Sequence, residues 1–245
     1  MPRLDLNCDL GEGAGHDATL MPLVTSANLA GGAHAGDEAT MRAACRLATE
    51  HGVGIGAHPG FEDRADFGRR EQPVTPEQAA MLVRTQVAAL AAIAGDKLRH
   101  VKLHGALYNQ VSRDPRLAAA VAGELQRFRP DLILFALAGS ELLRAARARQ
   151  LRVAGEVFAD RTYQADGSLT PRARPDALIR QEELAVAQVR RMIFEGVVQA
   201  TDGTMVPVEA DTVCLHGDGP DPVAFARRLR AELGRSGVEF RAFGA

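Results

Sequence analysis

Residues 4–13, LDLNCDLGEG, decide how the chain folds, because they read as a β-strand with one polar face. Apolar and polar residues alternate through the segment, and this period of two is typical of a strand. The polar positions are Asp5, Asn7 and Asp9. Carboxylates on one face of a first strand do not fit an apolar core, so we expect that face to line a polar interior that serves as a site.

The composition is that of one globular domain, which we predict to span residues 1–245. Twenty-nine basic and 31 acidic residues give a net charge of -2, so no basic field for nucleic acid is present. No apolar run approaches the roughly 20 residues that a membrane helix needs. We therefore expect a cytoplasmic protein that binds a small molecule, with no membrane partner. The cysteines, Cys8, Cys45 and Cys214, form no CxxC pair and are expected to be reduced.

Short apolar segments alternate with helical patterns along the chain, as in βα units around a parallel sheet. Strands are expected at RLDLNCD, SANLA, VGIGAH, HVKLH, LILFALA, RVAGEVF, TVCLH and VEFRAF, and a hairpin at VVQATDGTMVPV. The number of units and the chain length fit a (β/α) barrel. An open doubly wound sheet is the alternative.

Three helices have clear sequence signals. Thr75 opens a capping box with proline at the first helical position, and this helix is expected to end at Gly95. Asp37 is expected to cap a helix that ends at Gly52. A third helix is expected over residues 176–196.

Polar or small residues occupy one register in four of the expected strands. Strand by strand they are Asp5, Asn7 and Asp9; Gly54, Gly56 and His58; His100, Lys102 and His104; and Thr212, Cys214 and His216. In a barrel this register faces the lumen. The glycines would leave room there for a ligand.

Three histidines, His58, His104 and His216, each end an expected strand and precede a turn. The C-terminal ends of barrel strands carry the chemistry of such folds, and Asp9 and Glu156 fall at comparable positions. One such histidine alone reads as structural. Three of them with two carboxylates predict an active site at this rim.

Lys102 stands out because only two of the 29 basic residues are lysines. In the polar register it would hold a phosphate or a carboxylate, or stabilise an oxyanion. The alternative is an ion pair with Asp5 or Asp9 that holds the barrel together. The loop NLAGGAHAGDEATM places His34 among glycines before the helix capped by Asp37, where backbone N–H groups could receive an anion.

Seven motifs together resemble the LamB/YcsF family, also called the family of 5-oxoprolinase A subunits. They are DLNCDLGE, NLAGGAHAGDEATM, GAHPGFEDR, VKLHGALYN, EVFADRTY, LTPR and VCLHGDGP, in the family's order from the first strand to the last. Two positions depart from the family pattern, Gly31 in place of cysteine and Leu103 in place of proline. The first argues against a catalytic thiol in that loop, and the second leaves Lys102 and His104 in place.

The resemblance implies an α/β fold with an irregular seven-stranded (β/α) barrel, similar to the glycoside hydrolase and deacetylase barrel. It also implies ATP-dependent hydrolytic opening of 5-oxo-L-proline to L-glutamate, carried out with partner subunits B and C. ATP is the implied cofactor, with Mg²⁺ as a candidate ion.

The resemblance and the rim position together suggest roles for individual residues. Catalytic roles are assigned to Asp9, His58, Lys102, His104 and His216. Asp9 with His58 or His104 would be the general base or, if a divalent metal is bound, its ligands. Candidate substrate-binding residues are Asn7, Glu12, Asn28, His34, Asp37, Glu156, Asp160, Arg161 and Asp218, with Arg161 expected to bind the substrate carboxylate.

Two other functions fit the same residues. One is a metal-dependent amidohydrolase or deacetylase that acts without ATP and without partners. The other is a non-catalytic subunit that binds the lactam while partner subunits perform the chemistry.

Overall fold

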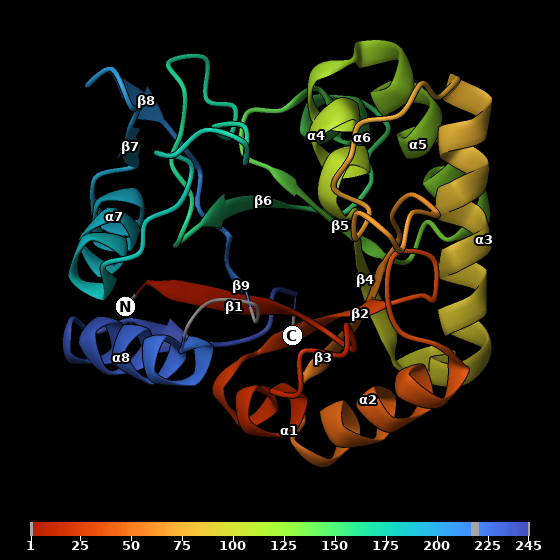
Figure 1. The fold of residues 1–245 in the computed structure, drawn as a ribbon, viewed down its shortest axis with the longest axis horizontal. Coiled ribbons are helices and arrows are strands. Elements are labelled where there is room, and N and C mark those ends of the chain that lie inside the picture. Colours follow the sequence, from red (N-terminus) through yellow and green to blue (C-terminus); the bar gives the residue numbers. More distant parts are fainter. Residues whose placement is uncertain (1, 217–220, 245) are drawn as a thin grey trace.

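Seven parallel strands close into a barrel in the computed structural model, which describes residues 2–216 and 221–244. The first strand pairs with both the second and the last strand, and this pairing closes the barrel (Figure 1). The strands are β1 (Arg3–Leu10), β2 (Ser26–Ala30), β3 (Gly54–His58), β4 (Leu98–Lys102), β5 (Ile133–Leu137), β6 (Val153–Phe158) and β9 (Thr212–His216). The predicted barrel is confirmed, and the open doubly wound sheet is excluded.

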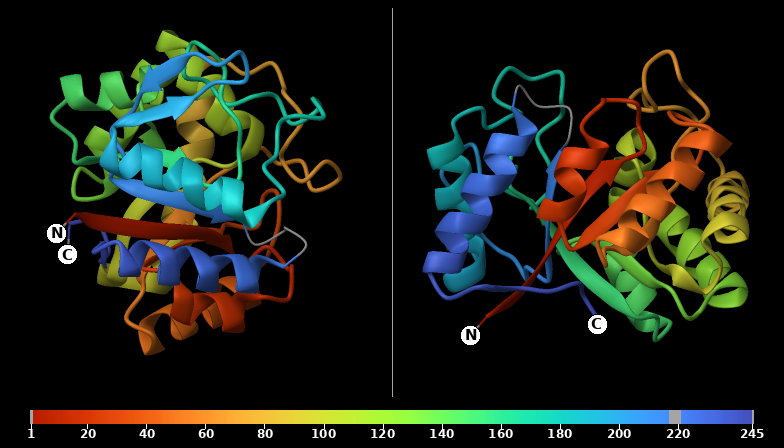
Figure 2. Two further views of the ribbon diagram at one scale, coloured as in Figure 1. Left: turned by 90° about the vertical axis from the view of Figure 1, so that its left-hand side faces the viewer. Right: turned by 90° about the horizontal axis from the view of Figure 1, so that it is seen from below.

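Helices surround the barrel and bury its apolar outer face (Figures 1 and 2). They are α1 (Asp17–Leu20), α2 (Glu38–Glu50), α3 (Pro76–Ala94), α4 (Gly105–Arg113), α5 (Pro115–Phe128), α6 (Glu141–Ala148), α7 (Glu182–Phe194) and α8 (Pro222–Arg235), with 3₁₀ turns η1 (Met21–Leu23) and η2 (Gly95–Lys97). The two ends of the chain lie on one side of the molecule (Figure 2), where the short strand β10 (Glu239–Phe240) pairs with the start of β1.

The helix signals in the sequence act as predicted at α2 and α3. Asp37 accepts a hydrogen bond from the Thr40 N–H at the start of α2. Thr75 and Gln78 form the reciprocal capping box of α3, which ends at Gly95 with a positive φ of 59°. The hairpin is also present, as β7 (Val197–Gln199) paired antiparallel with β8 (Met205–Pro207).

Three predicted boundaries are wrong. Helix α7 begins at Glu182 rather than near residue 176, because the backbone of residues 177–179 bonds to residues 160–162 instead of forming a helix. Strand β4 ends at Lys102, so His104 precedes helix α4 instead of ending the strand. Of the segment VEFRAF, only β10 is a strand, and it lies outside the closed barrel.

The polar register faces the lumen, as the alternation of β1 predicts. Asp5 accepts hydrogen bonds from Ser26 (2.7 Å) and Thr212 (2.5 Å). Asn7 donates to Glu156 (3.0 Å) and to Thr212 (2.8 Å) across the barrel. Because buried polar groups are costly without partners, these cross-strand bonds make a polar lumen stable.

We expected the lumen glycines to leave room for a ligand, and at Gly56 this expectation is wrong. The space beside Gly56 is filled by a side chain. The His100 ring lies where a Gly56 β-carbon would be, stacks on Phe135 and bonds to Asn28 Oδ1 at 2.8 Å. Gly54 is likewise close to Ser26, with 3.3 Å from an added β-carbon to the hydroxyl oxygen.

One helical segment, Pro76–Lys97, is long and apolar enough to cross a membrane by length and composition alone. In this fold it buries Ala79, Val83, Val87 and Leu90 on the barrel side. A helix that covers a sheet in a globular protein meets the same criteria, so the segment is weak support for a membrane span.

The Gly56→Ala substitution tests the packing of the lumen. The new methyl group overlaps the His100 ring and breaks its bond to Asn28, so we expect a loss of about 2–3 kcal/mol in the free energy of unfolding. Chemical denaturation measures this loss. Gly234→Ala in α8 is the control, because its β-carbon meets open space and should leave stability unchanged or slightly higher. Equal stability of both variants would contradict the packing described here.

Candidate active site

The centre of the site is the ammonium group of Lys102 at the C-terminal end of β4. Its Nζ lies 2.8 Å from Asp9 Oδ1 and 2.9 Å from Glu156 Oε1, and the side chain is 2% exposed. It also contacts Asn7 Oδ1 at 3.2 Å and Cys214 Sγ at 3.0 Å. Burial alone would lower the pKa of Lys102, but the carboxylates, Asp9 above all, hold it well above its ordinary value. Lys102 is therefore a fixed positive charge.

Asp9 is held as an anion by its neighbours. Burial would raise the pKa of Asp9, but His58 and Lys102 hold it well below its ordinary value of 3.8. Its Oδ1 accepts from Lys102 and from Asn28 Nδ2 at 2.8 Å. Its other oxygen, Oδ2, lies 3.3 Å from His58 Nε2. One oxygen thus supports the barrel and the other faces the histidines.

His58 and His104 meet at one side of the pocket. His58 Nε2 and His104 Nδ1 are 2.9 Å apart. Burial and the two neighbouring histidines hold the pKa of His104 well below its ordinary value. His34 comes from the loop after β2 and stacks on His104 with 3.7 Å between ring centroids.

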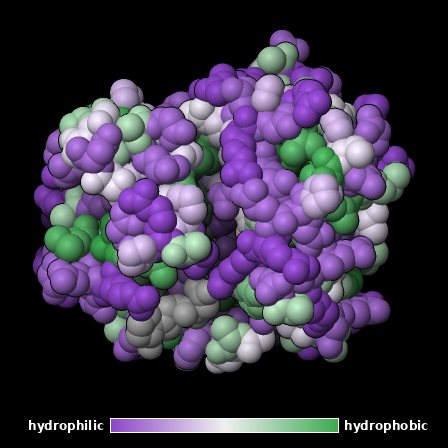
Figure 3. Space-filling view, turned by 45° about the horizontal axis from the view of Figure 1, so that its top comes forward, coloured by the Kyte–Doolittle hydropathy of each residue, from purple (hydrophilic) through white to green (hydrophobic). Residues whose placement is uncertain are grey.

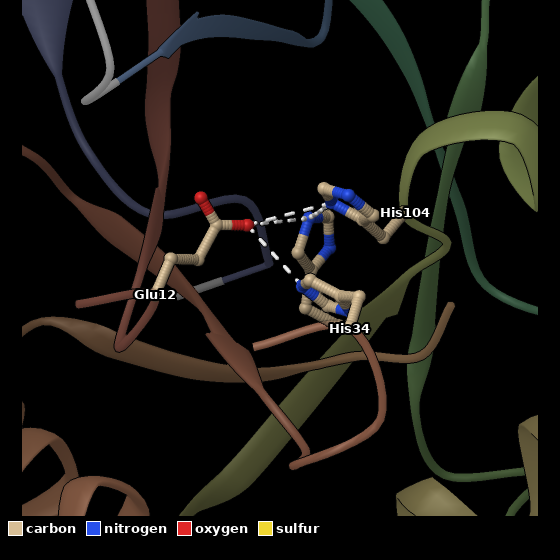
Figure 4. A group of neighbouring side chains, drawn as sticks. Glu12, His34 and His104 are labelled. Carbon is tan, nitrogen blue, oxygen red and sulfur yellow. Dashed lines mark hydrogen bonds and ion pairs between the residues drawn. The ribbon is translucent and has the colours of Figure 1, made fainter. Parts of the chain in front are cut away.

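Glu12 joins these histidines from the loop after β1. Its Oε1 lies 3.3 Å from His34 Nε2 and 3.4 Å from His104 Nδ1. Figure 4 shows the Glu12 carboxylate pointing at both rings. Glu12 and His34, placed among the substrate-binding candidates, thus share one group with His58 and His104.

His216 lines the same pocket, next to Asp9 in strand register, and does not belong to the group of Glu12, His34, His58 and His104. Its Nδ1 lies 2.8 Å from Asp160 Oδ2, and its ring stacks on Phe158. Burial would raise the pKa of Asp160, but His216 and the nearby arginines lower it. A carboxylate that orients one imidazole nitrogen leaves the other nitrogen free for proton transfer.

The pocket at Lys102 brings together all five predicted catalytic residues. Its walls include Asp9, His58, Lys102, His104 and His216. A second cavity adjoins it and shares His216 and Arg172 as lining residues. Hydrophilic side chains dominate the hollowed face of the molecule in Figure 3.

Some predicted residues lie elsewhere. Asp37 is exposed and its carboxylate accepts from Thr40, so it caps α2 and lies outside the pocket walls. Asp218 lies outside the described residues. Arg161 does line the pocket, but it is 3% exposed and donates to the Thr170 carbonyl at 2.6 Å and to the Ala177 carbonyl at 3.3 Å. These bonds tie its guanidinium to the loop.

Sequence reasoning missed several pocket residues, of which Tyr108 and Arg172 matter most for the chemistry. Tyr108 donates to Glu156 Oε2 at 2.8 Å from helix α4, and burial raises its pKa well above the ordinary value. It lies four residues after His104, the residue that precedes this helix. Arg172 is half-buried, lines both cavities, and makes no hydrogen bond or ion pair with the residues that the structure describes. It lies in the quoted LTPR motif.

The two departures from the family pattern lie in buried surroundings. A β-carbon at Gly31 would meet the Gln86 side chain at 3.4 Å, and Gln86 in turn bonds to both backbone groups of Gly60. A side chain at residue 31 would therefore contact this clamp. Leu103 is 1% exposed and belongs to the apolar core.

The Lys102→Met substitution tests the central charge. Two buried carboxylates lose their counter-charge, so we expect a loss of about 3–5 kcal/mol in the free energy of unfolding at neutral pH. The wild-type pKa of Asp9 lies below 3.8, so its contribution is present above that pH and is lost as the pH falls through the folded pKa. In the variant Asp9 keeps the burial that raises its pKa and loses the Lys102 charge that lowers it, so its stabilising contribution at neutral pH should become smaller than in the wild type.

Denaturation curves measured from acid to neutral pH test the expected loss of stability in Lys102→Met. Lys97→Met is the matched control, because Lys97 is the other lysine, is exposed and, among residues 2–216 and 221–244, hydrogen-bonds only to Thr49 Oγ1 at 3.4 Å. A Lys102→Met protein as stable as this control would show that the ion cluster does not hold the barrel.

Comparison of the sequence and structure with known proteins shows the family of this chain. The chain is 51% identical to the 5-oxoprolinase A subunit of Bordetella parapertussis, over 98% of this chain and 99% of that protein. It is 50% identical to the 5-oxoprolinase A subunit of Geobacillus thermodenitrificans, over 99% and 97% of the two chains.

Solved structures share the fold. A lactam utilization protein from Thermus thermophilus superposes with a TM-score of 0.90 at 44% identity, over 98% of this chain and all of that one. A family 4 acetyl xylan esterase from Clostridium thermocellum has the same barrel, with a TM-score of 0.52 at 16% identity over 98% and 87% of the chains. The model of the LamB/YcsF family matches residues 4–245, so the chain belongs to the LamB/YcsF family.

Proposed function

We propose that this chain is the A subunit of a 5-oxoprolinase, which opens 5-oxo-L-proline to L-glutamate with ATP hydrolysis. Full-length relatives at about half identity carry that name. The observation that carries the proposal is the buried Lys102–Asp9–Glu156 cluster beneath a pocket with histidines on two sides. A pocket with fixed charges and proton carriers suits a reaction that moves protons at a polarised carbonyl.

The chemistry explains the need for ATP. Amide resonance deactivates the lactam carbonyl, and the five-membered ring is favoured over the open amino acid. Phosphorylation of the lactam oxygen makes the carbonyl carbon electrophilic. Water then bonds to that carbon, the ring carbon–nitrogen bond breaks, and a proton passes to the nitrogen. A second water hydrolyses the resulting γ-acyl phosphate to glutamate and phosphate.

Asp9 and His58 are suited to hold the attacking water. Asp9 Oδ2 and His58 Nε2 are paired at 3.3 Å, and both residues line the pocket. Lys102 keeps Asp9 ionised, and its three N–H bonds have four acceptors within 3.2 Å in the barrel. We therefore assign Lys102 an electrostatic role, instead of a direct bond to phosphate.

His216 is suited to protonate the ring nitrogen as it leaves. Asp160 orients its Nδ1, and the ring borders both cavities. A histidine other than His58 is thus available in the pocket to give the proton that the leaving nitrogen needs.

Arg172 is the arginine that we assign to the substrate carboxylate. Its side chain borders both cavities and has its donors free of partners within the described part of the chain. Arg161, which the sequence suggested for this role, uses donors on two backbone carbonyls. Burial and the adjacent Arg172 lower the pKa of Arg161 to about 10, so an anion beside the pair would be stabilised.

The B and C partner subunits and the nucleotide complete the proposal. The lettered name that the relatives carry indicates an enzyme of several different subunits. Mg²⁺ is proposed to arrive with the nucleotide, because it prefers oxygen ligands and phosphates. The proposed compartment is the cytoplasm, where ATP is available.

A second candidate function is a metal-dependent amidohydrolase that needs neither ATP nor partners. The observation that favours it is the convergence of Glu12, His34, His58 and His104. The third reading, a lactam-binding subunit, predicts that site variants change binding and leave turnover at saturation intact.

Reconstitution separates these three functions. We expect glutamate and ADP in equal amounts from 5-oxoproline, ATP and Mg²⁺ only when this chain and the B and C subunits are all present. His104→Ala should lower kcat by at least about 100-fold, because a group in direct contact with His58 is lost. His51→Ala, an exposed histidine after α2, is the matched control. Turnover without ATP or partners would establish the amidohydrolase instead.

The two arginines make a separate test. Arg172→Gln should raise the KM for 5-oxoproline about 10- to 100-fold with little change in thermal stability, since it removes a charged hydrogen-bond donor from the substrate. Arg161→Gln should instead lower the melting temperature, because it leaves buried carbonyl oxygens without their donor. If Arg161→Gln raised the KM and Arg172→Gln lowered the melting temperature, the roles of the two arginines would be the other way round.

A further inference from the structure

Two nitrogens in the histidine group, His58 Nε2 and His104 Nδ1, face each other, and neither carries a proton when both rings are neutral. His58 Nδ1 bonds to the Lys102 carbonyl at 2.9 Å, and His104 Nε2 bonds to the Phe67 carbonyl at 2.9 Å. A carbonyl oxygen only accepts, so each of these nitrogens carries the ring hydrogen. The remaining nitrogens present lone pairs to each other across 2.9 Å. Two lone pairs at this distance repel unless a positive charge lies between them or beside them.

Two more donor atoms border the same point. Glu12 Oε1 lies 3.4 Å from His104 Nδ1 and 3.8 Å from His58 Nε2. His34 Nε2 lies 3.3 Å from Glu12 Oε1, and all four donor atoms are within 4.8 Å of one another. Ligands of a tetrahedral metal at about 2.0–2.1 Å are separated by about 3.3 Å, which is close to most of these distances.

The surroundings support metal binding. The outer nitrogens of His58 and His104 bond to backbone carbonyls, as metal-binding imidazoles commonly do. His34 Nδ1 is buried and has no hydrogen-bond partner among the described residues, so no outer contact prevents Nε2 from presenting a lone pair. The side chains of all four residues are at most 9% exposed.

Asp9 is less suited to this role than the sequence suggested. Its Oδ1 is already bonded to Lys102 and Asn28, and the Lys102 ammonium would repel a cation bound there. Glu12 has no such cation beside its Oε1 among the contacts of the described residues. Glu12 therefore takes the place of Asp9 in the proposed set of metal ligands.

We propose that Glu12, His34, His58 and His104 bind one divalent transition-metal ion such as Zn²⁺ or Co²⁺. Three imidazoles and one carboxylate suit these ions and do not suit Mg²⁺ or Ca²⁺, which take oxygen ligands. When bound, the ion would supply a Lewis acid at the pocket wall. His58 and His104 also belong to the proposed 5-oxoprolinase pocket. Cobalt binding is measured without turnover, so a failure of this proposal and a failure of the reconstitution experiment are distinguishable.

Cobalt titration tests the site without any activity measurement. The full-length protein, freed of metal by chelator and dialysis, is titrated with CoCl₂ by calorimetry and visible absorption. We expect one Co²⁺ per chain, the intense visible bands of tetrahedral Co²⁺, and a higher melting temperature with the ion than without it. His104→Ala should weaken binding at least 100-fold and Glu12→Gln at least 10-fold.

His216→Ala is the matched control, because it removes a histidine from the same pocket but not from this group. It also tests the other possible ligand set, Asp9, Cys214 and His216. Unchanged cobalt binding in this variant supports the proposal, and loss of binding there overturns it. Circular dichroism of the metal-free variants checks that each folds, and His34→Gln replaces any variant that does not. Absence of saturable binding at millimolar Co²⁺ also overturns the proposal and leaves a shared proton between His58 and His104.

Discussion

The structure depends on one buried charge, the ammonium of Lys102 between the carboxylates of Asp9 and Glu156. These three residues come from β4, β1 and β6, so their ion pairs join strands across the lumen. The neighbouring anions, Asp9 above all, hold the pKa of Lys102 well above its ordinary value, and His58 with Lys102 holds that of Asp9 well below its own. A barrel filled by apolar layers would be stable without this cluster, but it would hold no charged pocket floor.

Much of this arrangement follows from the alternation within single strands. Asp5, Asn7 and Asp9 share a face in any β-strand, and a run of βα units leaves that face the lumen of a closed barrel. The strand-end positions of His58 and His216 follow from the same pattern, because both residues end their strands in the structure. Local periodicity is sufficient for these features.

The partners of these residues depend on loops, which carry no such period. Glu12 and His34 reach His104 from two separate loops, and the carbonyl that fixes His104 belongs to Phe67. Phe67 has a positive φ of 55°, a conformation that no sequence pattern of this chain indicates. Arg161 and Arg172 both lie near the pocket, and only the backbone carbonyls around Arg161 distinguish their roles. From the sequence, a glycine that faces the lumen could make room either for a ligand or for a side chain. In the structure, the His100 ring fills the space beside Gly56.

The pairing of β1 with β9 has a consequence for how the protein is made. Asn7 and Thr212 bond to each other although 205 residues separate them. Strand β1 therefore cannot pair with β9, its second neighbour in the barrel, until nearly the whole chain has been synthesised. During synthesis, the half of the barrel that has emerged exposes an unpaired strand edge that carries Asn7, and the Glu156 carboxylate to which Asn7 donates is made much later. Contacts this distant in sequence slow folding and prolong the exposure of such edges. The residues that create the pocket therefore also make the nascent chain of this protein vulnerable to misassembly until its last barrel strand is complete.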